Sequence, residues 1–75
     1  MSSANLNKVQ KVLAARIKTL RKAAGLSQES LAHEADIDRT YVSQLERAMV
    51  NPSLSVLVRV SNVLDVSVSQ LLDLE

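Results

Sequence analysis

Apolar residues recur at helical spacing over the first third of the chain. The stripe has spacings of four, four, three and four residues and consists of Val9, Leu13, Ile17, Leu20 and Ala24. Such spacing places side chains on one face of an α-helix. The next residue is Gly25, which adopts a positive φ at low cost and so commonly ends a helix. The pattern predicts a first helix over residues 6–24.

Two capped helices separated by a short turn are predicted next. Ser27 and Asp38 carry side-chain oxygens that can accept hydrogen bonds from the free N–H groups at a helix N-terminus. We therefore expect helices over residues 28–35 and 39–48. Because only three residues, 36–38, connect them, the two helices form a tight helix-turn-helix over residues 28–47.

The last third of the chain predicts two more helices. Pro52 cannot continue a helix. The next residue, Ser53, is expected to cap a fourth helix that ends near Leu64. Ser67, with Gln70 three residues later, forms a capping-box pattern for a short fifth helix. With one glycine, one proline and one aromatic residue, the chain lacks the turn and strand composition of a β-fold. The sequence predicts one all-α domain of five helices over residues 1–75.

Size and composition restrict the function. A chain of 75 residues without cysteine has little interior beyond its core, and it contains no metal-ligand, catalytic-triad or phosphate-loop pattern. We expect no catalysis, cofactor or metal, and an uninvolved, exposed His33. The sequence lacks a secretory signal or a membrane span, so we expect a cytoplasmic protein without a membrane partner. Residues 1–47 carry eight basic against five acidic side chains, and residues 48–75 one against three, which ordinary surface charge also explains.

The third predicted helix has one face of chemically varied polar residues. On a helical wheel Val42 and Leu45 lie on the core side. The opposite side and the N-terminal tip carry Arg39, Thr40, Ser43, Gln44 and Arg47. A solvated face would more often carry lysine and glutamate. A short helix fits the major groove of B-DNA, about 12 Å wide, where these side-chain types recognise base edges, so this face predicts DNA contact.

Each side chain on this face suits a defined contact. Arg39 can bridge the two acceptors of guanine, Gln44 can pair with the adenine edge, and Thr40 can bond a base or pack on thymine. We expect base contacts from Arg39, Thr40, Ser43 and Gln44, and phosphate contacts from Gln28, Tyr41 and Arg47. The alternatives are a phosphate clamp or a solvated charge for Arg39, a phosphate contact for Ser43 and simple packing of the Tyr41 ring.

Two opposite charges flank the apolar stripes of the first and third helices. On helical wheels Arg21 lies about 40° from Ile17 and Glu46 lies about 40° from Val42, so each charge flanks the apolar stripe of its own helix. This placement predicts a partly buried ion pair that orients the third helix. Loss of either partner would leave the other charge buried and unpaired.

Three segments together resemble a known family: "RIKTLRKAAGLS", "QESLAHEADIDRTYVSQLER" and "NPSLSVLVRVSNVLDVSVSQLL". They resemble the phage-repressor and Cro-like (XRE-like) helix-turn-helix regulators over residues 13–72. "DRTYVSQLER…NPSL" is particularly similar to the small controller proteins of restriction–modification systems. The resemblance implies a lambda-repressor-like fold that binds DNA, and the same pairing of Arg21 with Glu46. It implies a backbone contact at Gln28 and groove positions for Arg39, Thr40, Ser43 and Gln44.

Two places depart from that family pattern. The turn usually contains glycine where this chain has Asp36, which tolerates left-handed geometry at some cost. After the third helix the family commonly has glycine and basic residues, whereas this chain has "AMV" at residues 48–50. We expect a slightly strained turn and weaker binding to the DNA backbone.

The C-terminal third holds more apolar residues than a small monomer needs. Leu57, Val60 and Leu64 suffice to cover the core from the fourth helix, and exposed apolar patches usually mark an interface. We expect an isologous homodimer through residues 54–75, with contacts from Val56, Val60, Val63, Leu71 and Leu74. Such a dimer places two third helices about 34 Å apart on a palindromic operator. The alternative is that these side chains fill a monomer core.

These features predict a sequence-specific, double-stranded-DNA-binding transcriptional regulator that acts as a homodimer. Binding near a promoter would block or recruit RNA polymerase. The alternative function is a helical protein–protein interaction module, such as an antitoxin, whose third helix binds a protein. Salt distinguishes the two, because binding through phosphate contacts weakens steeply as salt rises.

Overall fold

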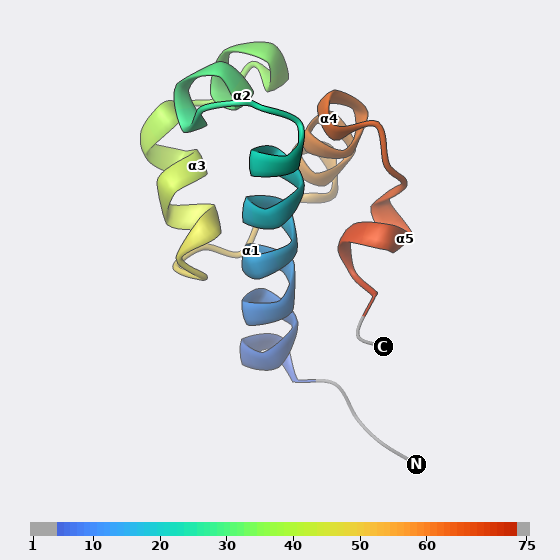
Figure 1. Cartoon of the computed structure of the whole chain (residues 1–75). Coiled ribbons are helices and arrows are strands. Elements are labelled where there is room, and N and C mark those ends of the chain that lie inside the picture. The colour runs from blue at the N-terminus through green and yellow to red at the C-terminus, as the bar shows by residue number, and fades with distance from the viewer. Residues whose placement is uncertain (1–4, 74–75) are drawn as a thin grey trace.

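Five α-helices follow one another in residues 5–73, the part of the chain that this computed structural model describes. They are α1 (Leu6–Ala23), α2 (Gln28–Ala35), α3 (Arg39–Glu46), α4 (Leu54–Leu64) and α5 (Val68–Leu71) (Figure 1). No strand occurs in this range. The predicted all-α fold of five helices is therefore confirmed, and most boundaries agree within one residue. No helix among residues 5–73 is long and apolar enough to cross a membrane.

The starts of the four helices after α1 are set by the side chains that the sequence indicated. Ser27 accepts a hydrogen bond from the backbone of Ser30, and Ser53 accepts one from Val56. Ser67 forms a complete capping box with Gln70. The helices begin at these positions because each cap satisfies N–H groups that have no partner inside the helix.

The helix ends depend on left-handed backbone geometry. Gly25, Asp36, Ala48 and Asp65 all have φ between 56° and 74°. Glycine adopts this region freely, whereas a residue with a Cβ does so at a cost. The predicted third helix was too long, because the chain turns at Ala48 and α3 ends at Glu46.

The long helix α1 forms the axis of the molecule. α2 lies across its C-terminal end, α3 lies along one side, and α4 and α5 lie on the other (Figure 1). α2 packs against both α3 and α4, and α1 packs against α3 and α5. This arrangement holds α3 at the edge of the molecule, with one face turned to solvent.

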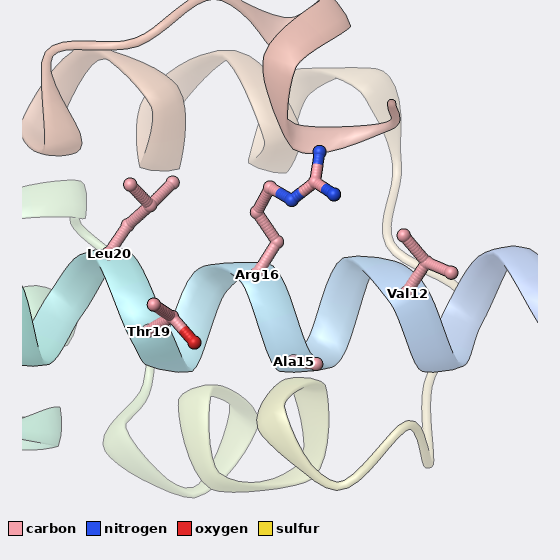
Figure 2. Close-up of a pocket in the computed structure, with 5 residues that line it drawn as sticks. All are labelled: Val12, Ala15, Arg16, Thr19 and Leu20. Carbon is pink, nitrogen blue, oxygen red and sulfur yellow. The ribbon is translucent and has the colours of Figure 1, made fainter. Parts of the chain in front are cut away.

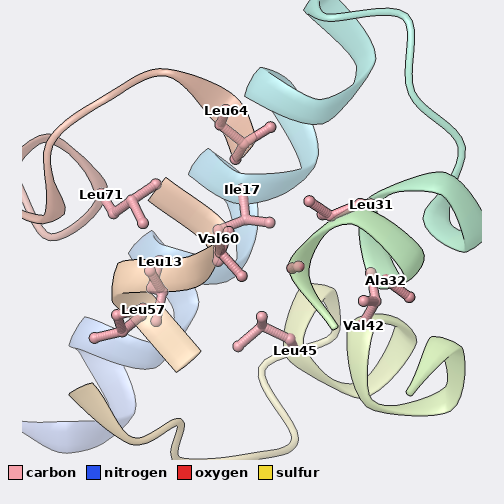
Figure 3. Packing of buried hydrophobic residues seen from close by; sticks show 11 residues of the cluster. Leu13, Ile17, Leu31, Ala32, Val42, Leu45, Leu57, Val60, Leu64 and Leu71 are labelled. Atoms are coloured by element: carbon pink, nitrogen blue, oxygen red, sulfur yellow. The ribbon is translucent and has the colours of Figure 1, made fainter. Parts of the chain in front are cut away.

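Side chains from all five helices meet in a single core (Figure 3). Its completely buried large residues are Ile17, Leu31, Val42, Leu45, Val60 and Leu71. Small residues of α2, Ala32 and Ala35, are also buried and allow α2 and α3 to approach closely. The core thus fixes α3 relative to the other helices through Val42 and Leu45.

The residues expected at a dimer interface need correction. Val60 and Leu71 are 0% exposed, because Val60 lies at the centre of the α4 core stripe and α5 turns Leu71 inward (Figure 3). Val56 and Val63 are half-buried and pack against the core. Leu74 lies outside the described residues. The large apolar side chains that α4 does expose are Leu54, 73% exposed, and Val58, 46% exposed.

Candidate nucleic-acid interface

The outer face of α3 gathers the polar residues that the sequence singled out. Val42, Leu45 and Glu46 are the buried residues of this helix. On its other side Arg39, Thr40 and Arg47 are exposed, and Ser43, Gln44 and Tyr41 are half-buried. The helical period separates the two sets, so that one face of this short helix presents donors and acceptors of several kinds to the solvent.

These polar groups are not committed to the protein itself. Within residues 5–73, no side-chain hydrogen bond or ion pair joins Arg39, Thr40, Tyr41, Ser43, Gln44 or Arg47 to another residue. Instead, Asp38 caps the helix by accepting from the backbone N–H of Thr40. A guanidinium, a carboxamide and hydroxyl groups are therefore available together for a polar partner.

Arg21 and Glu46, expected as an ion pair, lie in contact behind this face. Arg21 Nε lies 2.6 Å from Glu46 Oε2, and Arg21 Nη2 lies 3.0 Å from Oε1. The two residues are 8% and 9% exposed. This hydrogen bonding with Glu46 raises the pKa of Arg21 above its ordinary value, against the opposing effect of burial. The two-point contact fixes the rotation of α3 relative to α1.

Gln28 joins the same cluster, which the sequence did not indicate. Its Nε2 donates to Glu46 Oε1 over 3.1 Å. An amide nitrogen has two hydrogens, so the contact leaves one for a partner outside. Arg21 also donates from Nη1 to the carbonyl of Leu26, just before α2 begins. Side chains from three helices therefore share one hydrogen-bonded network.

Two longer-range hydrogen bonds hold the loops on either side of α3. Arg59 of α4 donates to the carbonyl of Asp36 in the turn before α3, and Gln10 of α1 donates to the carbonyl of Val50 behind it. Sequence reasoning missed both, because the partners are 23 and 40 residues apart and no local pattern connects them. They restrain the two segments that position α3.

Tyr41 borders a hollow beside the N-terminal half of α3. The hollow is about 410 Å³ in volume and is lined by Ile37, Asp38, Tyr41, Asn51, Ser53 and Val56. Tyr41 is therefore neither fully packed in the core nor fully exposed. Since Val56 lines the same hollow, this flank of α4 faces the helix-turn-helix.

A second hollow lies on α1, away from the hollow that Tyr41 borders. It measures about 450 Å³ and is lined by Val12, Ala15, Arg16, Thr19 and Leu20 (Figure 2). Its lining contains no acid–base pair or nucleophile–base pair. Among the described residues no group of three or more His, Cys, Asp or Glu side chains is placed to hold a metal ion.

Comparison with known proteins adds an independent finding. The model of the helix-turn-helix family HTH_3 matches residues 17–71. The HTH-type transcriptional regulator SinR of Bacillus subtilis (strain 168) is 49% identical over 59 residues, which are 77% of this chain and 53% of SinR. The chain thus spans about half the length of this curated relative.

Solved structures of similar sequence have the same fold. The restriction-modification controller protein C.AhdI from Aeromonas hydrophila superposes with a TM-score of 0.80 at 37% identity, over 83% of this chain and 94% of that one. A structure of SinR in complex with DNA gives a TM-score of 0.79 at 47% identity, over 81% of this chain and 98% of that one. The similarity to a controller protein that the sequence suggested is therefore present among these relatives.

Proposed function

The chain belongs to the HTH_3 helix-turn-helix family, and on this basis we propose that it is a sequence-specific DNA-binding transcriptional regulator. The observation that carries the proposal is the outer face of α3, where varied polar side chains have no hydrogen-bond partner within residues 5–73 and the core holds the helix in place. The structure of similar sequence in which SinR is in complex with DNA supports the same partner for this chain.

Base recognition is assigned to four residues of α3. Its N-terminal tip carries Arg39, whose planar guanidinium can donate twice to a guanine. Gln44 supplies the carboxamide that suits adenine. Thr40 and Ser43 lie between them on the helix surface and complete the set with hydroxyl groups. A partner protein would not require this combination of groups, which favours a base-pair edge as the partner.

Phosphate contacts are assigned around the edge of the same face. Gln28 begins α2, where backbone N–H groups and the positive end of the helix dipole favour an anion. Its amide, oriented by Glu46, adds a donor beside them. Arg47 follows α3 with an exposed guanidinium, and Tyr41 adds a phenolic hydroxyl. Such contacts set the position of the protein on DNA but do not select its sequence.

Dimerisation through α4 completes the proposal. Leu54 and Val58 are four residues apart on one side of α4 and expose a large part of their apolar surface to water. Packing this pair against a second copy would remove that surface from water. One short helix contacts few base pairs, so two copies on a palindromic operator would provide the selectivity that one lacks. The regulator bound near a promoter would then exclude or recruit RNA polymerase.

Selection of bound duplexes from a random DNA pool tests this function. The wild-type protein is expected to enrich a palindrome, and Arg39→Ala to relax one position in each half-site at a cost of about 1–3 kcal/mol. Arg39→Lys is the matched variant, because it keeps the charge but loses the planar fork. If Arg39 only clamps phosphate, the lysine variant retains the wild-type preference. If the wild-type protein enriched no DNA sequence, the proposed regulator function would be rejected and a protein partner would be sought instead.

A further inference from the structure

A second periodic stripe runs along α1, and the core does not use it. Its spacings are three, four, three and four residues, and it consists of Lys8, Lys11, Ala15, Lys18 and Lys22. All five residues are exposed. Because α1 is helical from Leu6 to Ala23, this spacing aligns the four lysines on one face. Across the 14 residue steps from Lys8 to Lys22 the stripe measures about 21 Å, at about 1.5 Å per residue.

The charge of this face is not compensated within the described residues. α1 contains six lysine and arginine residues and no acidic residue. Of the six, Arg21 pairs with Glu46 and Arg16 donates to the carbonyl of Gln70. The four lysines lie within 4.0 Å of no carboxylate of residues 5–73. A row of like charges on a helix is mildly destabilising, so the stability of the fold gains nothing from the stripe.

The stripe lies on the side of α1 that is nearer to α3. Figure 2 shows Ala15 and Thr19 on this side, whereas Arg16 and Leu20 point towards α4 and α5. Ala15 is a member of the lysine stripe, so the flanking lysines share its orientation. Arg21 agrees with this placement, because it lies three residues after Lys18, beside it on the helix surface, and reaches across to α3. The positive surface of α1 therefore continues sideways from the proposed DNA-binding face.

We propose that the lysine stripe of α1 is a second DNA-binding surface, which holds the phosphate backbone of the duplex flanking the groove that α3 occupies. This inference rests on the proposed function and adds a surface outside the helix-turn-helix. Duplex DNA carries one negative charge per about 1.7 Å of axis, so it can match the whole length of the stripe. Lysine suits phosphate as a mobile point charge that needs no fixed geometry.

Protein and lipid partners fit this surface less well. Lysine is depleted in the centres of protein–protein interfaces, and the stripe offers only Ala15 as an apolar contact. A helix that binds a membrane surface inserts an apolar face, but the apolar face of α1 is buried, as Leu13 and Ile17 show. A continuous polyanion is the partner whose chemistry agrees with four aligned and uncompensated lysines.

The experiment measures the salt dependence of DNA binding for a variant with all four lysines changed to glutamine. Glutamine has nearly the same helix propensity as lysine, so α1 is retained. Fluorescence anisotropy would measure the Kd for the enriched operator and for a scrambled duplex at several salt concentrations from about 50 to about 200 mM. The slope of log K against log salt is expected to become shallower by about 0.9 for each phosphate that the variant no longer neutralises. Both duplexes should lose affinity by the same factor, because phosphate contacts carry no sequence information.

Matched variants separate this inference from the function itself. Replacing the four lysines with arginine keeps the charges, and it should keep the wild-type slope. The pairs Lys8→Gln with Lys11→Gln and Lys18→Gln with Lys22→Gln repeat the test if the fourfold variant does not fold. An unchanged slope in a folded glutamine variant overturns the inference. In that case a loss of specificity in Arg39→Ala would still support the proposed function, whereas a wild-type protein without specificity would reject the function separately.

Discussion

The guanidinium of Arg21 and the carboxylate of Glu46 join α1 to the helix that carries the proposed DNA contacts, with Nε 2.6 Å from Oε2. The residues that precede and follow Glu46 serve different purposes, since Leu45 is buried in the core and Arg47 is exposed. An ion pair at this point therefore sets which side of α3 faces outward. The pair is almost completely buried, so water does not weaken it as it weakens a surface ion pair.

Glu46→Ala is expected to lower the free energy of unfolding by about 3–5 kcal/mol, because Arg21 would keep a buried charge without a partner. Urea denaturation followed by circular dichroism measures this change. The double variant Arg21→Met with Glu46→Leu should lose much less, since it removes both charges and keeps the packing. Glu34→Ala, an exposed position on α2, is the control. If Glu46→Ala were as stable as Glu34→Ala, the structural role of the ion pair would be contradicted.

Ala48→Gly is expected to stabilise the protein by about 1 kcal/mol. Ala48 has a φ of 58°, in the left-handed region where a Cβ costs about 1–2 kcal/mol and glycine does not incur this cost. The greater flexibility of glycine in the unfolded chain reduces the gain. Ala15→Gly in the middle of α1 is the control and should destabilise by about 0.5–1 kcal/mol. Thermal unfolding would show opposite shifts in Tm, and equal shifts would refute the strain at Ala48.

Local patterns in the sequence predicted most of the fold, because the relevant physics is local. Ser27, Ser53 and Ser67 were predicted as caps from their own chemistry and that of residues two or three positions away. Strain at Asp36 was also predictable, because the similar family usually has glycine at this position of the turn. The turn requires a positive φ there. The end of α3 was not predictable in this way, because Ala48 adopts left-handed geometry without any side-chain feature that favours it.

Tertiary contacts account for what the sequence did not predict. Leu71 has the same apolar chemistry in a core and in an interface, and only the packing of α5 against α1 and α4 buries it here. The hydrogen bonds of Gln28, Arg59 and Gln10 depend equally on how separate helices meet. The polar face of α3 was predictable because a single helix contains it.

Replacing both Leu54 and Val58 with lysine is expected to shift the chain from dimer to monomer. The two side chains are exposed in the isolated fold, so the monomer should unfold at nearly the wild-type Tm, whereas packing against a second copy would bury two charges. Sedimentation equilibrium measures the dissociation constant, which should rise by at least tenfold. Met49→Lys, also at an exposed apolar residue but outside α4, is the control. Equal dimer affinity in both variants would place the interface elsewhere.

Gln28→Ala and Arg47→Ala should weaken DNA binding in different ways, although both residues are assigned to phosphate. Gln28 is neutral, so its loss releases no additional counterion and the slope of log K against log salt should stay unchanged. Loss of the positive charge of Arg47 should make that slope shallower by about 0.9. Both variants should weaken binding equally on the operator and on a scrambled duplex. The Arg21–Glu46 contacts do not involve Gln28, so its variant should remain folded. If Gln28→Ala instead changed the preferred sequence, its role would be to orient a base-contacting residue, and the assignment of this amide to phosphate would be wrong.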